Sequence, residues 1–410
     1  MYDWANSVYS LTITTAILPP YFSAVTGGTE GTIFGIKNSS IYAYILSLSF
    51  LTIACLNPIL SAIADTGGNR KKFMQFFSLL GSTSCALLFF FDENNIWSGL
   101  VFTATACIGF CGSLVFYNTY LPEIVSEDLI DKISARGFSL GYIGSVLLLI
   151  INLVMIQDIF PDSKYGAKLS FVTVGFWWFL FAQYSFSGLP QDKSKKTPDN
   201  IIKKSFVRLL VVWRQLQRLD WTRKFLYSFF FYSMGTQTVM YMATLFGEQV
   251  VKMTMTELIL LVLLLQLIAI GGSYLFSIIS KAKGNTYSIL LSISIWILIC
   301  ISASFIQEGM KLYFYIIGAF VGLVMGGIQS MSRSTFAKLI PLNTNMKTSY
   351  YSFYETLEKF AMASGTFVFG FISHLTGSMT YSALFLSIFF IIGFLILIQI
   401  PSKKSYSIKL

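Results

Sequence analysis

Three ionisable residues stand close together inside a long stretch that is otherwise apolar. Glu355, Glu358 and Lys359 fall within residues 348–374, on the order of 10 Å from the start of that stretch at a helical rise of about 1.5 Å per residue. Charged side chains at such depth in a bilayer are costly, and they are usually paired and functional. Glu355 precedes Lys359 by four positions, the favourable direction for a helical ion pair, and Glu358 shares their face. Two acids beside one base leave an excess carboxyl that could carry a proton, whereas a purely structural pair is the alternative.

Two other apolar stretches carry polar side chains at matching helical spacing. The sets are Asp3, Asn6, Ser7, Ser10 and Thr14 in the first stretch and Ser233, Thr236, Gln237, Met240 and Thr244 in residues 224–247. At roughly 100° per residue, each set lies on one face of a helix. Lipid contact explains such faces poorly, so we expect them to line a path for a solute. Hydrogen bonding between neighbouring helices is the alternative.

The sequence lacks the motifs of nucleotide-driven or catalytic proteins. It has no Gly-x-x-x-x-Gly-Lys-Ser/Thr, no His-Glu-x-x-His and no Gly-x-Ser-x-Gly, so we predict neither direct use of ATP nor an enzyme. Cys107 and Cys111 are one helical turn apart without a third ligand nearby, and the single His374 closes an apolar helix. We therefore predict no metal and no cofactor.

Composition places the whole chain in a membrane. Of its 410 residues, 55% are hydrophobic and 12% are charged, against roughly 45–50% and 25% in soluble globular domains. The net charge of +10 would suggest a nucleic-acid partner in a soluble protein. Here the basic residues fall between apolar segments, so we expect them to face a membrane surface and predict no nucleic-acid partner.

Apolar runs of membrane-spanning length recur twelve times along the chain. We predict spans at residues 2–25, 41–63, 73–91, 96–119, 137–158, 167–189, 224–247, 256–280, 286–306, 312–331, 348–374 and 378–400. The longest polar interval follows the sixth span. We therefore expect a six-helix half at 1–189, a linker at 190–223 with an amphipathic helix, and a second six-helix half with a short tail at 224–410.

Basic residues are distributed unevenly between alternate loops. Of the 29 Lys and Arg residues, one set of loops holds only Lys37, Lys164, Lys168, Lys252 and Lys311, and all the others except Lys359 fall in the opposite set. This bias predicts that both termini and the linker are cytoplasmic.

No basic stretch precedes the first apolar run, so we expect no cleaved signal peptide. We expect instead that Met1 is an internal methionine behind a short cytoplasmic lead.

The loop between the second and third spans carries a dense group of charges. Its sequence, Asp65-Thr66-Gly67-Gly68-Asn69-Arg70-Lys71-Lys72, resembles the Asp-x-x-Gly-x-Arg-Lys loop of the major facilitator superfamily. The resemblance implies that Asp65, Gly68 and Arg70 belong to a gate that holds the cytoplasmic helix ends in one state. An ordinary basic loop is the alternative, and Asn69 departs from the basic residue often found there.

A second resemblance covers nearly the whole chain. It rests on six short runs: Asp3-Trp4-Ala5-Asn6-Ser7, Leu121-Pro122-Glu123-Ile124, Ser134-Ala135-Arg136-Gly137, Gly141-Tyr142-Ile143-Gly144, Gly326-Gly327-Ile328-Gln329 and Ser332-Arg333-Ser334. These runs are similar to the superfamily branch that contains the fungal vacuolar effluxers of autophagy and uncharacterised bacterial permeases. The resemblance implies a major-facilitator fold and amino-acid efflux. It also adds Arg136 to the gate, and Lys359 and Tyr354 match positions that the family fills.

Together these observations predict an all-α membrane protein with twelve transmembrane helices in two six-helix halves. Its predicted function is secondary active transport of a small solute by alternating access, with amino-acid efflux and proton coupling. Its expected partners are a small-molecule substrate, protons and the lipid bilayer, and we expect a monomer in a bacterial inner membrane. A receptor or scaffold that kept the fold is the alternative, and a membrane enzyme acting on lipid is a third.

Overall fold

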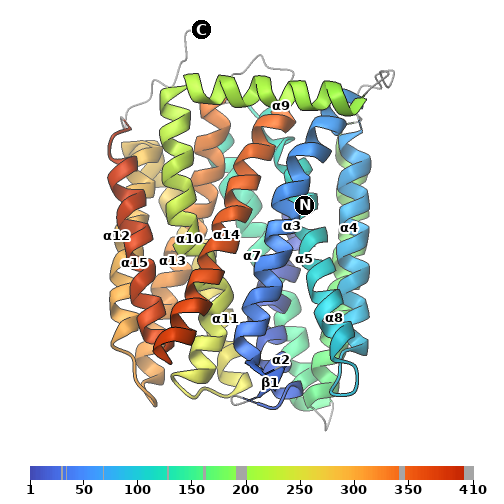
Figure 1. Cartoon of the computed structure of the whole chain (residues 1–410), viewed down its shortest axis with the longest axis vertical. Helices are drawn as coiled ribbons and strands as arrows, with labels where there is room; N and C mark the ends of the chain where they lie inside the picture. Colours follow the sequence, from blue (N-terminus) through green and yellow to red (C-terminus); the bar gives the residue numbers. More distant parts are fainter. Residues whose placement is uncertain are drawn as a thin grey trace.

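The computed structural model describes residues 1–28, 31–33, 35–67, 69–126, 129–159, 163–190, 201–340 and 347–400. Among these residues the regular structure is helical except for one short hairpin of β1 (Thr32–Ile33) and β2 (Ile36–Lys37). The long helices run side by side along one axis (Figure 1). This arrangement suits a bilayer, because a helix satisfies its backbone hydrogen bonds without help from water.

The helices before residue 190 form what we call the first group. The first span is continuous but has three parts, α1 (Tyr2–Val8), a π-helix η1 (Tyr9–Ile17) and α2 (Leu18–Val25). The remaining elements are α3 (Asn38–Gly67), α4 (Arg70–Leu87), η2 (Leu88–Phe90), α5 (Ile96–Asn118), α6 (Leu121–Ile124), α7 (Ile130–Val154), η4 (Met155–Ile159) and α8 (Ser163–Gly188).

The second group follows residue 219 and lies beside the first (Figure 1). Its elements are α10 (Asp220–Gln249), α11 (Met255–Lys283), α12 (Asn285–Ser304), α13 (Lys311–Leu339), α14 (Lys347–Thr376) and α15 (Met379–Leu397). Between the groups in sequence, α9 (Ile201–Arg218) crosses one end of the bundle (Figure 1).

Ten stretches of described helix are long and apolar enough to cross a membrane. Helices α10 and α14 are not among the ten, although each has 30 residues and runs along the same axis as its neighbours (Figure 1). Helix α14 carries the Glu355, Glu358 and Lys359 cluster, which lowers its mean hydropathy. The ten stretches together with α10 and α14 are consistent with the predicted twelve spans.

The two groups have their most extensive contacts along two pairs of helices. Helix α3 packs along α14, and α7 packs along α11. Within the second group α11 and α13 approach closely, since a Cβ added at Gly322 or Gly326 would lie 2.4 or 2.3 Å from a carbonyl oxygen of α11. Gly322 and Gly326 are therefore packing residues of this helix pair.

Adjacent glycines on α11 provide a matched test of this packing. A Cβ at Gly272 would lie 2.1 Å from the carbonyl oxygen of Leu323, whereas a Cβ at Gly271 meets no atom within 4 Å. Gly272→Ala should therefore destabilise the protein by about 1–3 kcal/mol through overpacking. Gly271→Ala should be neutral or stabilising, because it removes backbone freedom without a clash. Thermal unfolding of the two variants in detergent checks this, and equal melting temperatures would contradict it.

Candidate functional site

A cavity of about 120 Å³ lies between helices of the two groups. Its lining includes every residue that the sequence predicted for a substrate or coupling site: Lys359, Glu355, Glu358, Tyr354, Asp3, Asn6, Ser10, Gln237 and Thr236. These side chains come from α1, η1, α10 and α14, so the charged cluster and most of the two polar faces surround one space. Thr14 and Thr244, the last residue of each face, do not line it. Their convergence makes this cavity the candidate site.

The charged cluster of α14 is almost fully enclosed. The Lys359 ammonium lies 2.6 Å from a carboxylate oxygen of Glu358 and 3.2 Å from one of Glu355. The side chains of Lys359 and Glu355 are 1% and 2% exposed, whereas that of Glu358 is 17% exposed. Glu358 is therefore the member of the cluster that a small molecule in the cavity can reach most readily.

Neutral amides tie the two acids to other helices. The side-chain amide of Gln237 on α10 donates to Glu358 over 3.0 Å, and that of Asn118 on α5 donates to Glu355 over 2.5 Å. Glu358 is thus fixed within the second group, while Glu355 is bonded across the interface to the first group. A change at Glu355 would be felt directly by both groups.

A second buried ion pair joins the groups. A terminal nitrogen of Arg333 on α13 lies 3.4 Å from a carboxylate oxygen of Asp3 on α1, and both side chains are nearly inaccessible. The other carboxylate oxygen of Asp3 accepts the Tyr117 hydroxyl over 2.5 Å. Such a pair persists in a membrane interior because each charge would be far more costly alone.

Helix α7 supports the guanidinium of Arg333. The Nε of Arg333 donates to the Ser134 hydroxyl, and one terminal nitrogen of Arg333 donates to the Ser134 carbonyl, each over 3.0 Å. The guanidinium also lies 4.3 Å from the centre of the Phe138 ring. A Cβ at Gly137 would lie 2.5 Å from Asp3 Oδ2 and 3.0 Å from a terminal nitrogen of Arg333. Gly137 therefore leaves the room that the ion pair occupies.

Arg333 and Asn118 were not predicted as site residues. The predicted tenth span ended at residue 331, which placed Arg333 in a loop, but α13 continues to Leu339 and carries Arg333 into the protein. The run Ser332-Arg333-Ser334 had marked the family resemblance and was the available signal. Asn118 is uncharged, so nothing local distinguishes it from other polar residues at helix ends.

Of the predicted gate residues, the structure describes the side chains of Arg70 and Arg136. Arg70 pairs with Glu123 on α6 at 2.7 Å, so this ion pair stays inside the first group. Gly68 and the side chain of Asp65 lie outside the described residues. Arg136 is exposed on α7 and forms no ion pair with the side chains that the structure describes. A common gate of Asp65, Gly68, Arg70 and Arg136 therefore stays a prediction.

A different ion pair links the groups near the end of the bundle that α9 covers. Asp131 at the start of α7 accepts from Lys338 at the end of α13 over 2.6 Å. The Asn285 amide nitrogen donates to Asp131 over 3.2 Å, and its oxygen accepts from Lys338 over 3.3 Å. Asn285 belongs to the loop after the eighth predicted span, whereas the predicted gate lay in the loop after the second.

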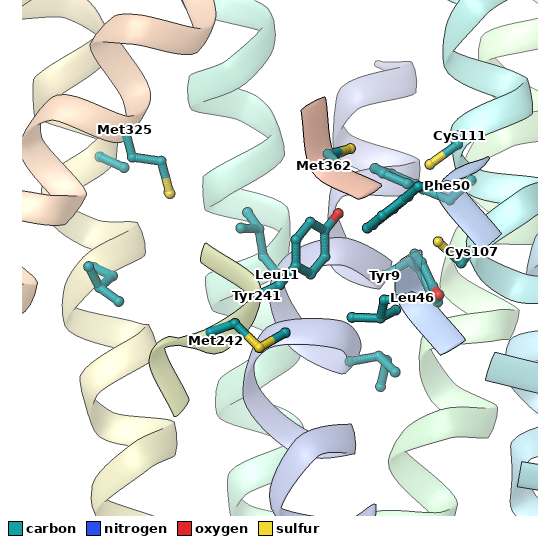
Figure 2. Packing of buried hydrophobic residues seen from close by; sticks show 14 of the residues in the cluster. Tyr9, Leu11, Leu46, Phe50, Cys107, Cys111, Tyr241, Met242, Met325 and Met362 are labelled. Atoms are coloured by element: carbon teal, nitrogen blue, oxygen red, sulfur yellow. The ribbon is translucent and has the colours of Figure 1, made fainter. Parts of the chain in front are cut away.

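An apolar layer borders part of the cavity (Figure 2). Tyr241 and Met362 line the cavity, and the Tyr241 ring packs on Phe50 with 5.2 Å between ring centres. Cys107 and Cys111 lie in the same packing and are buried (Figure 2). In the parts of the chain that the structure describes, no group of three His, Cys, Asp or Glu side chains is arranged to hold a metal ion.

Comparison with known proteins identifies a consistent set of relatives. A sequence model of the family described as "Vacuole effluxer Atg22 like" matches residues 1–407. The chain is 32% identical to the "Uncharacterized MFS-type transporter YxiO" of Bacillus subtilis, covering 99% of this chain and 94% of that protein. It is 23% identical to "Autophagy-related protein 22" of Saccharomyces cerevisiae, covering 91% and 79%.

Solved transporters share the fold at low sequence identity. The proton:xylose symporter XylE matches with a TM-score of 0.73 and 11% identity over 98% of this chain and 95% of that chain. The transporter FucP in its outward conformation matches with a TM-score of 0.65 and 14% identity over 98% and 97%. These likenesses show the architecture alone.

Solvent access to the cavity can be tested at Asn6. Asn6 lines the cavity, and its amide nitrogen has no hydrogen-bond partner among the described residues. Asn6→Cys should therefore react with a small water-soluble thiol reagent, and a solute bound in the cavity should slow that reaction. The adjacent Ala5 is fully buried and does not line the cavity, so Ala5→Cys is the matched control and should stay inert. An Asn6→Cys variant that never reacts would contradict this placement.

Proposed function

This chain belongs to the Atg22-like family of major facilitator superfamily transporters, and from that premise we propose that it is a proton-coupled secondary transporter of amino acids. Family membership makes it an integral multi-pass membrane protein that moves a small solute. The finer proposal is that its substrate is a small zwitterion and that transport is outward. The word "effluxer" in the family's description supports that direction, and "proton" in the description of XylE supports the coupling.

The observation that carries the proposal is the pairing of charges in a membrane-embedded cavity. Two cations, Arg333 and Lys359, and three acids, Asp3, Glu355 and Glu358, line the same space. A zwitterion carries both signs of charge, so its two charged groups can be received without leaving a buried charge unpaired. An uncharged sugar would form no ion pair with any of these five groups.

The excess acid supports coupling to protons. When all five groups are ionised the cavity carries one negative charge more than positive charge, and uptake of one proton cancels it. Glu358 holds the shorter contact with Lys359, at 2.6 Å against 3.2 Å for Glu355. We therefore assign the proton to Glu355, whose bond to Asn118 also lets the other group respond to it.

Alternating access would move the first group, residues 1–189, against the second, residues 224–410, with residues 190–223 as the connection. The pairs α3 with α14 and α7 with α11 are the surfaces along which such a motion would occur. Asp3–Arg333 and Asp131–Lys338 would separate when the end covered by α9 opens.

The distribution of basic residues supports a cytoplasmic location for that end, and the bacterial relative supports the inner membrane.

Uptake of labelled L-leucine into proteoliposomes tests the proposal. Lys359→Met should lower transport by about tenfold or more while the protein still folds, because two buried acids lose their counter-charge. Glu355→Gln should remove the response to an imposed pH gradient, whereas Glu358→Gln should keep that response and bind leucine more weakly. Lys281→Met, at an exposed position of α11, is the control and should transport normally.

The proposed function fails if wild-type protein moves no amino acid at any pH between roughly 5.5 and 8. The proposed site fails, with the function intact, if Lys359→Met transports leucine as well as the wild type. Circular dichroism and size-exclusion elution of each variant separate loss of transport from loss of fold.

A further inference from the structure

The two cations of the cavity differ in how much bonding capacity they have left. The Lys359 ammonium has three donors and is 1% exposed, and two carboxylates already lie at 2.6 and 3.2 Å from it. A substrate carboxylate approaching Lys359 would have to displace one of those acids and would meet the other. Lys359 is therefore a poor receptor for an additional anion.

The hydrogen-bond donors of Arg333 are less fully used than those of Lys359. Its bonds to Ser134 use Nε and one terminal nitrogen, whereas the other terminal nitrogen, Nη1, makes two contacts of 3.4 Å, to Asp3 and to Asn118. Ordinary N–H···O bonds span about 2.7–3.2 Å, and those between charged groups are shorter still. The donors of Nη1 are therefore available to a better placed acceptor, and the residue lines the cavity.

The present partner of Arg333 has an alternative bond. Asp3 accepts the Tyr117 hydroxyl over 2.5 Å, which is shorter than its contact with Arg333. Asp3 would keep this hydrogen bond if Arg333 turned toward another anion. The two bonds from Ser134 meanwhile keep the guanidinium at the cavity wall.

We propose that Nη1 of Arg333 receives the carboxylate of the substrate, which takes the place of Asp3. This inference rests on the proposed function, and it assigns the anionic end of the substrate to Arg333 on α13 rather than to Lys359 on α14. The ammonium end then faces Glu358, the most exposed acid of the cavity.

The exchange has a consequence for movement of the two groups. Asp3 belongs to the first group and Arg333 to the second, so their ion pair holds the groups together. A substrate carboxylate bound to Arg333 removes that link and keeps the arginine paired, while Asp3 loses its cation and keeps the hydrogen bond from Tyr117. Substrate binding thereby lowers the cost of separating the groups at this point.

The test measures binding of three probes to the purified full-length protein by isothermal titration calorimetry. The probes are L-leucine, 4-methylpentanoate, which lacks the ammonium group, and 3-methylbutylamine, which lacks the carboxylate. The main variant is Asp3→Asn/Arg333→Gln, which removes both charges and leaves none unpaired. Asp131→Asn/Lys338→Gln is the matched control, because it removes a second ion pair between the groups, at residues that do not line the cavity.

The Asp3→Asn/Arg333→Gln variant should bind leucine and 4-methylpentanoate at least about tenfold more weakly, since a charged hydrogen bond is lost. It should bind 3-methylbutylamine within about threefold of the wild type. The control should change its affinity for the three probes by one common factor, because it alters the contact between the groups and not the cavity lining. Arg333→Lys should also weaken carboxylate binding, and it provides the test if the double variant does not fold.

Retention of 4-methylpentanoate affinity by a folded Asp3→Asn/Arg333→Gln variant would overturn the inference, and wild-type binding of leucine would show that the proposed function still stands. If the wild type binds 4-methylpentanoate through Arg333 but does not bind leucine, the amino-acid assignment fails and the carboxylate site stands. Wild-type protein that binds neither carboxylate probe overturns both.

Discussion

Charged side chains inside a membrane must be paired, and that constraint organises this protein. The bilayer interior makes an isolated ammonium or carboxylate far more costly than it would be in water, so ionised groups persist there only beside counter-charges and hydrogen-bond donors. Lys359 with its two acids and Arg333 with Asp3 meet this requirement in one cavity. Each cluster also has a hydrogen bond or ion pair across the boundary between the helix groups, so the charge balance and the contact between groups depend on each other.

Short sequence runs that are far apart along the chain converge on the Arg333 ion pair. The first run supplies Asp3, the run at 134–137 supplies a hydroxyl, a carbonyl and the small residue Gly137, and the run at 332–334 supplies the arginine. Substitution of any of these would leave a buried charge less satisfied or would crowd the pair. Formation and support of the Arg333–Asp3 ion pair thus account for three of the runs by which the chain resembles its family.

The sequence predicted the fold and one of the two charge clusters, for a clear physical reason. Glu355, Glu358 and Lys359 interrupt a long apolar run, and neighbours on a helix can be paired by counting residues. Arg333 lies near a helix end, where apolar periodicity fades and predicted boundaries are least certain. Its partner Asp3 is 330 positions away, and only packing of the two helix groups brings them together. Arg136, the basic residue in the run at 134–137, is exposed and does not line the cavity.

The central claim is that solute and proton use the same cavity, so movement of one must be linked to movement of the other. Proteoliposomes that enclose a pH-sensitive dye test this most directly, when a leucine gradient is imposed without a pH gradient. The account predicts a change of internal pH that appears with leucine, scales with the amount transported and is absent from protein-free liposomes. Leucine transport with no change of internal pH would contradict it.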